Sequence, residues 1–194
     1  MTMAEGIGMA ATGYTLVIGD KNYSSWSLRP WLALRHCGIP FAEQCVSLRQ
    51  PESKAEILRH SPSGKVPVLK TETGAVWDSL AILEYVAERH PEHQLWPQDS
   101  QTRAAARCAS CEMHSGMTAR RSYGDGGPFL FGAFSNADAM FAPVATRFRT
   151  YGVDLASFGD DGSDTDYAER IFALAAMAEW TVGAKAEIRE LGRA

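Results

Sequence analysis

The chain has few cysteines, no excess of positive charge and no long hydrophobic run. Four cysteines among 194 residues are too few for a disulfide-stabilised scaffold of this length. The formal net charge is -4, which argues against a protein that binds nucleic acid through its phosphates. No apolar run approaches the roughly 20 residues that a membrane-spanning helix needs. We therefore expect neither a nucleic-acid partner nor a membrane partner.

The N-terminal segment also lacks the features of a secretory signal. Residues 1–13 have no basic region, and glycines interrupt their short apolar stretch. Because these residues are mostly small, we expect a flexible leader. The missing signal and the unpaired-looking cysteines predict a cytoplasmic location. Hydrophobic residues make up 45% of the chain and charged residues 22%, which is typical of a globular protein.

Residues 14–90 carry alternating strand and helix patterns. β-Branched and aromatic residues predict strands at 14–18, 41–48, 66–70 and 75–77. Apolar residues at helical spacing predict helices at 26–37, 51–60 and 78–90. A helix between the first two strands favours a parallel pair, and a short turn between the last two adds an antiparallel hairpin. This half of the chain is therefore expected to be a small mixed α/β domain.

The second half of the chain is expected to be helical. Residues 91–100 contain two prolines and no helical period, so we interpret them as a linker. Helical patterns follow at 101–123, 135–151 and 167–191, separated by glycine-rich loops at 124–128 and 159–163. Ser135 and Asp138 have the spacing of a helix capping box. The predicted fold is an α/β domain at 14–90 followed by an all-α domain at 101–194.

The segment Ser24–Arg29 lies where the first strand meets the first helix. Its hydroxyl groups are expected beside free backbone N–H groups and the positive end of the helix dipole. Such a place suits an anion, and a thiolate is an anion. The alternative is that one serine only caps the helix.

Two further segments could bind a ligand. Pro67 begins an apolar strand, and a cis bond before it would turn the Val66 backbone outward to pair with an extended peptide. An ordinary loop proline is the alternative. Asp78 and Ser79 open a helix, where the Ser79 hydroxyl suits a carboxylate and Asp78 suits an ammonium group. The alternative is a simple cap by Asp78.

The remaining polar clusters are weaker signals. Cys108, Cys111 and His114 suggest a redox or zinc site, but they lie inside an expected helix without a second ligand pair, so we expect no metal. The other histidines at 36, 60, 90 and 93 are expected at the surface or at helix ends. Met113, Met117 and Arg120 could line a substrate pocket, although helix amphipathicity explains them equally well.

Taken in order, the three segments resemble the cytosolic glutathione transferases of the serine type, closest to the zeta and related bacterial classes. Residues 24–34 are similar to the active-site segment that carries S-S-C-x-x-R in those classes, with Trp26 in place of the cysteine. Residues 61–67 are similar to the N-P-x-G-x-V-P segment, and residues 78–85 to the E/D-S-x-A-I-x-x-Y segment. The likeness runs from residue 14 to about residue 186.

The resemblance implies a thioredoxin-like domain that binds glutathione, a helical domain and a homodimer. It implies glutathione contacts at Ser24, Ser25, Trp26, Lys54, Val66, Pro67, Asp78 and Ser79. Ser24 would donate a hydrogen bond to the sulfur, and Val66, held by a cis Pro67, would pair with the cysteinyl backbone. Asp78 and Ser79 would bind the γ-glutamyl end, and Lys54 would meet the glycine carboxylate.

The activity implied is attack by the glutathione sulfur on a small hydrophobic electrophile. A free thiol with a pKa of about 8.5 is only a few per cent thiolate at neutral pH, so a serine hydrogen bond and a helix N-terminus would favour the reactive form. A glutathione-dependent isomerase and a non-catalytic glutathione-binding module are the alternatives. The helical domain is shorter than in the family between residues 123 and 128, which affects the electrophile pocket. Reduction through Cys108 or Cys111 is a minor third option.

Overall fold

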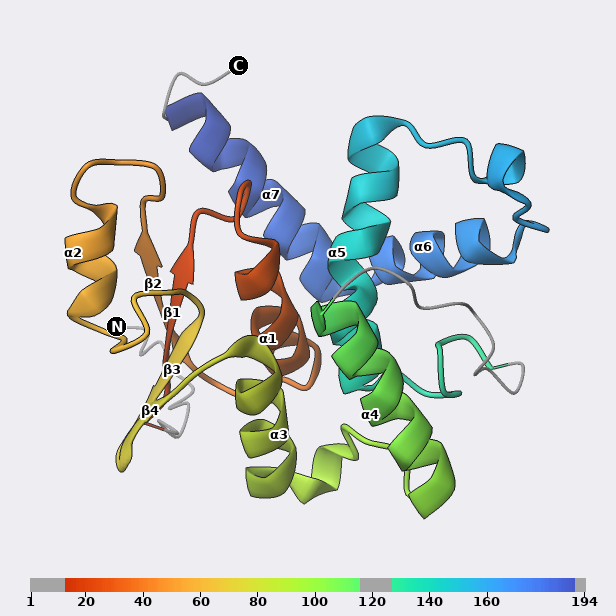
Figure 1. Ribbon diagram of the computed structural model, residues 1–194, viewed down its shortest axis with the longest axis horizontal. Coiled ribbons are helices and arrows are strands. Elements are labelled where there is room, and N and C mark those ends of the chain that lie inside the picture. The colour runs from red at the N-terminus through yellow and green to blue at the C-terminus, as the bar shows by residue number, and fades with distance from the viewer. Residues whose placement is uncertain (1–12, 116–126, 191–194) are drawn as a thin grey trace, which may run out of the picture.

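The computed structural model describes residues 13–115 and 127–190 (Figure 1). The leader, Met117, Arg120 and most of the loop at 124–128 lie outside the described residues. The elements are β1 (Thr15–Gly19), α1 (Ser25–His36), β2 (Ala42–Val46), α2 (Ser53–Leu58), β3 (Val68–Thr71), β4 (Gly74–Val76), α3 (Ser79–Arg89), the 3-10 turn η1 (Pro91–His93), α4 (Ser100–Ser115), α5 (Asn136–Tyr151), the 3-10 turn η2 (Leu155–Phe158), α6 (Ser163–Ala173) and α7 (Ala175–Glu190).

One mixed sheet organises the N-terminal half, with strand order β2-β1-β3-β4. Strands β1 and β2 are parallel, with Thr15 opposite Ala42, and α1 connects them. Strand β3 runs antiparallel to β1, with Leu16 opposite Leu69, and β4 pairs with β3 as a hairpin. The parallel pair and the antiparallel edge expected from the sequence are both confirmed.

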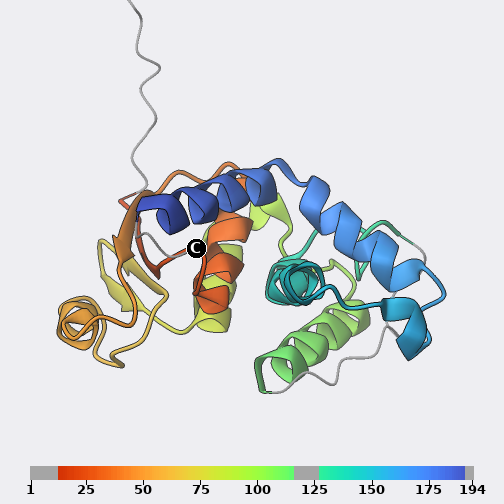
Figure 2. The ribbon, with the colours of Figure 1, turned by 90° about the horizontal axis from the view of Figure 1, so that it is seen from above.

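Successive side chains of β1 point to opposite faces of this sheet, and both faces are packed. Leu16 and Ile18 share an apolar cluster with residues of α1 and α3. Val17 shares a second cluster with Val68 and with Ile57 of α2. Helices α1 and α3 therefore cover one face and α2 the other, the arrangement of a thioredoxin-like domain (Figures 1 and 2).

Helices α5, α6 and α7 of the C-terminal half continue the same core, whereas α4 packs in two smaller apolar clusters. Helix α5 packs against α1 and α4, and α7 packs against both α1 and α6. Figure 2 shows α7 lying along α1 at the top of the molecule. The rings of Trp31 in α1 and Trp180 in α7 lie 5.1 Å apart, centroid to centroid. Both halves therefore share one apolar cluster, and none of the described helices is long and apolar enough to cross a membrane.

The prediction of a single helix at 167–191 is wrong. The structure has two helices, α6 and α7, separated at Leu174, whose backbone is extended with φ -64° and ψ 130°. Leu174 packs against the main core, and the Ala178 N–H bonds to the Leu174 carbonyl to start the new helix. Tertiary packing thus bends the chain where the sequence has no glycine or proline to signal a break.

Two local interpretations are refined by the structure. The capping box of Ser135 and Asp138 at the start of α5 is confirmed. The segment 91–100 is more than an extended linker, because Leu95 and Trp96 are buried and the Leu95 carbonyl accepts from the N–H of Asn136 at 2.8 Å. This segment therefore fixes the N-terminus of α5 to the end of the α/β half.

Candidate functional site

Ser24 is the N-cap of α1 and is buried. Its hydroxyl oxygen accepts a hydrogen bond from the Ser27 N–H at 3.3 Å and lies 2.7 Å from the Ser27 hydroxyl oxygen. The Ser27 hydroxyl in turn accepts from the Gly19 N–H at the end of β1, at 3.1 Å. The simple cap that the sequence left open is therefore present. It belongs to a hydrogen-bonded chain from β1 through Ser27 to Ser24.

The first turn of α1 also carries an exposed aromatic ring and a buried cation. The Trp26 side chain is 41% exposed, whereas Arg29 is 3% exposed. The guanidinium carbon of Arg29 lies 3.9 Å from the centre of the Trp26 ring, a cation–π contact. Burial, with a smaller contribution from Arg147, lowers the pKa of Arg29 to about 10, and Asp78 opposes the shift. Its Nε and Nη1 have no hydrogen-bond partner among the described residues.

His114, near the C-terminal end of the described part of α4, joins two of the predicted segments. Its ring lies 5.0 Å from the Trp26 ring in an edge-on arrangement. Its Nε2 lies 2.9 Å from a carboxylate oxygen of Asp78, and its Nδ1 is buried without a partner among the described residues. The N-terminal regions of α1 and α3 therefore meet through a residue of the helical half.

At the N-terminus of α3, Asp78 and Ser79 have different environments. Asp78 is the N-cap, and one carboxylate oxygen accepts from the N–H groups of Leu80 and Ala81 at 3.2 and 3.5 Å. Ser79 is fully buried, and its hydroxyl oxygen has no hydrogen-bond partner in the described structure. A buried hydroxyl without a partner costs about 1–3 kcal/mol, which a bound acceptor would offset.

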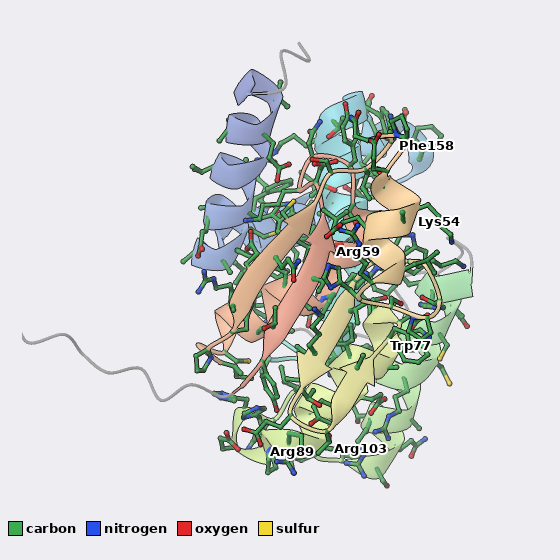
Figure 3. The ribbon with its side chains drawn as sticks, turned by 90° about the vertical axis from the view of Figure 1, so that its left-hand side faces the viewer. Lys54, Arg59, Trp77, Arg89, Arg103 and Phe158 are labelled. Atoms are coloured by element: carbon green, nitrogen blue, oxygen red, sulfur yellow. The ribbon has the colours of Figure 1, made fainter. Side chains whose placement is uncertain are left out.

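Val66 and Lys54 lie at the loop that precedes β3. The Val66–Pro67 peptide bond is cis, as the resemblance implied, and so is the Trp77–Asp78 bond. Val66 lies outside the strand ladder, because β3 begins at Val68. The Lys54 ammonium of α2 donates to the Gly64 carbonyl at 3.2 Å. Figure 3 shows Lys54 and Trp77 on the same side of the domain.

The remaining predicted residues fall outside this arrangement or beyond the described residues. Met113 is 5% exposed and packs in an apolar cluster with residues of α1, α3 and α5, which leaves it little surface for a substrate. Met117 and Arg120 are not among the described residues. Cys108 and Cys111 are exposed free thiols on α4.

Comparison with known proteins agrees with this architecture. Residues 23–89 match the model of the glutathione S-transferase N-terminal domain. A probable maleylacetoacetate isomerase from Caenorhabditis elegans is 36% identical over 97 residues, which is 50% of this chain and 44% of that protein. A zeta-class glutathione S-transferase from Euphorbia esula is 37% identical over 82 residues, 42% of this chain and 36% of that protein. Residues 23–89 are thus similar to the N-terminal domain of glutathione S-transferases.

For the helical half, the similarity to known proteins rests on the fold alone. A glutathione transferase homologue from Burkholderia GL BGR1, solved with bound glutathione, superposes with a TM-score of 0.71 at 23% identity, covering 89% of this chain and 98% of that one. The sequence matches cover less than half the length of each of the two relatives named above.

Sequence reasoning assigned no role in this arrangement to three of its residues. Ser27 had a signal, because it lies three residues after the cap Ser24 and so faces it across the first turn. Arg29 was included in the motif but given no role. His114 had no local signal, since its partners Trp26 and Asp78 come from distant parts of the chain.

Proposed function

We propose that the protein is a glutathione transferase that activates the glutathione thiol for attack on a small hydrophobic electrophile. The observation that carries the proposal is the buried, unpartnered Ser79 hydroxyl at the N-terminus of α3. A γ-glutamyl carboxylate would accept from this hydroxyl and from the Ser79 N–H at the start of the helix. Asp78, beside it, offers its carboxylate to the ammonium group of the same residue.

Ser24 is assigned the sulfur end of the tripeptide. Either hydroxyl of the Ser24–Ser27 pair can be the donor, and the Ser27 hydroxyl, which already accepts from the Gly19 N–H, can donate its proton to the Ser24 oxygen. That orientation leaves the Ser24 proton available to donate to the glutathione sulfur. A donor at this position, together with the positive end of α1, would lower the pKa of the bound thiol. Ser27 is then a positioning residue.

The middle of the tripeptide is assigned to the loop before β3. The Val66 backbone, free of the strand ladder, would pair with the cysteinyl backbone as an added strand does. Ser25 and Trp26 lie one and two residues beyond Ser24, and Lys54 lies at the loop where the glycine carboxylate would approach. All four cysteines are free thiols, as a reducing compartment requires, and we propose a cytoplasmic location.

A second activity has support from the relatives. Several of the similar proteins are maleylacetoacetate isomerases, and the same activated sulfur could add to and leave an electrophilic double bond. Such an isomerase would form no stable conjugate and would consume no glutathione. Product analysis therefore separates the two activities: a glutathione conjugate indicates transfer, and an isomerised substrate with unchanged glutathione indicates isomerisation.

The assignment of Ser24 is tested by turnover of a generic aromatic electrophile across a pH series. For Ser24→Ala we expect the apparent pKa of the bound thiol to rise by one to two units and kcat/KM at pH 6.5 to fall about 10- to 100-fold. Ser24→Thr, which keeps a hydroxyl, should restore most of the activity. Unchanged activity and an unchanged thiol pKa in Ser24→Ala would remove the role of Ser24.

Binding is measured separately from turnover. Loss of the cap in Ser24→Ala is expected to cost about 1 kcal/mol of folding free energy, so each variant is checked by urea unfolding. Glutathione affinity by calorimetry should change much less than the thiol pKa. Tight glutathione binding without turnover by the parent over a panel of electrophiles would instead favour the non-catalytic module.

A further inference from the structure

A group of three potential metal ligands lies at the end of α3, away from the residues assigned to glutathione. Helix α3 ends at Arg89, and the chain then turns through His90 into η1. Within four positions it presents His90, Glu92 and His93, each offering one ligand atom, and these three atoms lie within 4.8 Å of one another. Arg89, labelled in Figure 3, marks this end of the domain.

The spacing of these atoms fits a small coordination sphere. One carboxylate oxygen of Glu92 lies 3.4 Å from His90 Nδ1 and 3.7 Å from His93 Nε2. Ligands held at about 2.0–2.1 Å around a tetrahedral zinc ion are separated by roughly 3.4 Å. The Glu92 oxygen thus lies at a near-tetrahedral edge length from both imidazole nitrogens.

The backbone and a second contact hold His90 in place. The other ring nitrogen of His90, Nε2, lies 3.3 Å from the Tyr14 hydroxyl, at the start of the sheet. An imidazole that binds a metal commonly has its second nitrogen held in this way by a polar partner, which fixes the tautomer and the ring orientation. The turn itself is closed by the His93 N–H bonding to the His90 carbonyl at 3.1 Å.

We propose that His90, Glu92 and His93 bind one divalent transition-metal ion of the zinc type. Two imidazole nitrogens and one carboxylate oxygen suit Zn²⁺, Co²⁺ or Ni²⁺, whereas Mg²⁺ and Ca²⁺ prefer oxygen ligands. Three protein ligands leave at least one position for water. Through His90 and Tyr14 the ion would tie the end of α3 to the first strand, so its role is structural and independent of the proposed transferase activity.

The test is a titration of the untagged, reduced chain with Co²⁺, followed by absorbance and by calorimetry. We expect one ion per chain, visible d–d bands of a low-symmetry site, and displacement by Zn²⁺. Glu92→Gln and His93→Gln should each weaken binding at least tenfold. Both side chains lie near the surface, so unfolding of these variants without metal should match the parent.

The matched control is His60→Gln. His60 Nε2 also lies beside a glutamate, 3.2 Å from a carboxylate oxygen of Glu56, but the described residues provide no third ligand there. Binding should be unchanged in this variant. Absence of Co²⁺ binding by the parent, undiminished binding by His90→Gln/His93→Gln, or a sulfur-to-cobalt charge-transfer band showing that thiols hold the ion would each overturn the proposal.

Discussion

The imidazole of His114 lies 2.9 Å from the carboxylate of Asp78, so a residue of the helical half contacts the N-cap of α3 directly. The same imidazole packs edge-on against Trp26. The two helix N-termini assigned to the thiol and to the γ-glutamyl carboxylate are thus bridged by α4. The helical half therefore contacts both helix N-termini of the proposed glutathione site.

Replacing Asp78 by Asn is expected to weaken glutathione binding about fivefold. Asn keeps a cap acceptor for the N–H groups at the start of α3 but removes the charge that would face the ammonium group, an exposed ion pair of ~1 kcal/mol. Calorimetry with glutathione and with its deaminated analogue measures the effect. The analogue should show no penalty from the substitution; an equal penalty for both ligands would contradict the contact.

Asp138 should make folding stability fall as the pH rises. Burial raises the pKa of this carboxyl to about 6, although the backbone N–H groups of Leu130 and Ser135 and the hydroxyls of Ser135 and Tyr167 donate to it. The unfolded chain has the ordinary value near 4, so between about pH 4 and pH 6 the folded state binds more protons. The stabilisation is present below the unfolded pKa and decreases as the pH rises through the folded pKa, by up to about 3 kcal/mol.

Urea unfolding at pH 4.5, 5.5 and 7.5 measures this contribution of Asp138. The Asp138→Asn variant cannot titrate at this position, so the slope of its stability against pH should be less negative than that of the parent. Taking the difference between the two proteins removes the contribution of histidines that titrate in the same range. Equal slopes would show that the four hydrogen bonds keep the carboxyl pKa ordinary.

Trp180→Ala is expected to destabilise the protein by about 3–5 kcal/mol. Trp180 is 4% exposed and packs on Trp31, so its removal leaves a cavity where α7 meets α1. Val182, two residues along the same helix, is 69% exposed, and Val182→Ala should change the free energy of unfolding by less than about 0.5 kcal/mol. Both substitutions raise helix propensity, so similar losses in the two variants would show that packing against Trp31 does not account for the cost.

The cysteines should differ in their rates of alkylation. Burial, with a further contribution from Glu92, raises the pKa of the Cys37 thiol to about 11, so about one thiol in a thousand is ionised at pH 8. Cys108 and Cys111 are exposed on α4. Iodoacetamide followed by peptide mass spectrometry should show both reacting at least tenfold faster than Cys37. In urea the difference should disappear, and its absence in the folded protein would argue against a raised pKa of the half-buried Cys37 thiol.

Features set by local sequence were predicted well. The apolar, β-branched run of β1 indicated a strand, and Ser135 with Asp138 defines the start of α5 by spacing alone. The break at Leu174 could not be predicted, because its extended conformation is stabilised by packing against the main core and no residue nearby disfavours a helix.

The residues of the candidate site also fall into a group that local sequence indicates and a group that depends on tertiary contacts. Ser24, Val66 and Ser79 lie at strand and helix boundaries that local patterns indicate, and the family motifs then assign them roles. His114 and the environment of Arg29 depend on contacts between residues far apart in the chain, which a single sequence does not contain. His90 and His93 were expected only at the surface or at helix ends, and only the fold shows that their ligand atoms converge with that of Glu92.

The apolar cluster that runs from β1 through α1 to α7 restricts how this protein can be recombined with its relatives. A chimera that joins residues 13–90 to a foreign helical half would place unfamiliar side chains against Trp31. Such exchanges would require matching substitutions along the outer side of α1, so the two halves are expected to evolve as a pair.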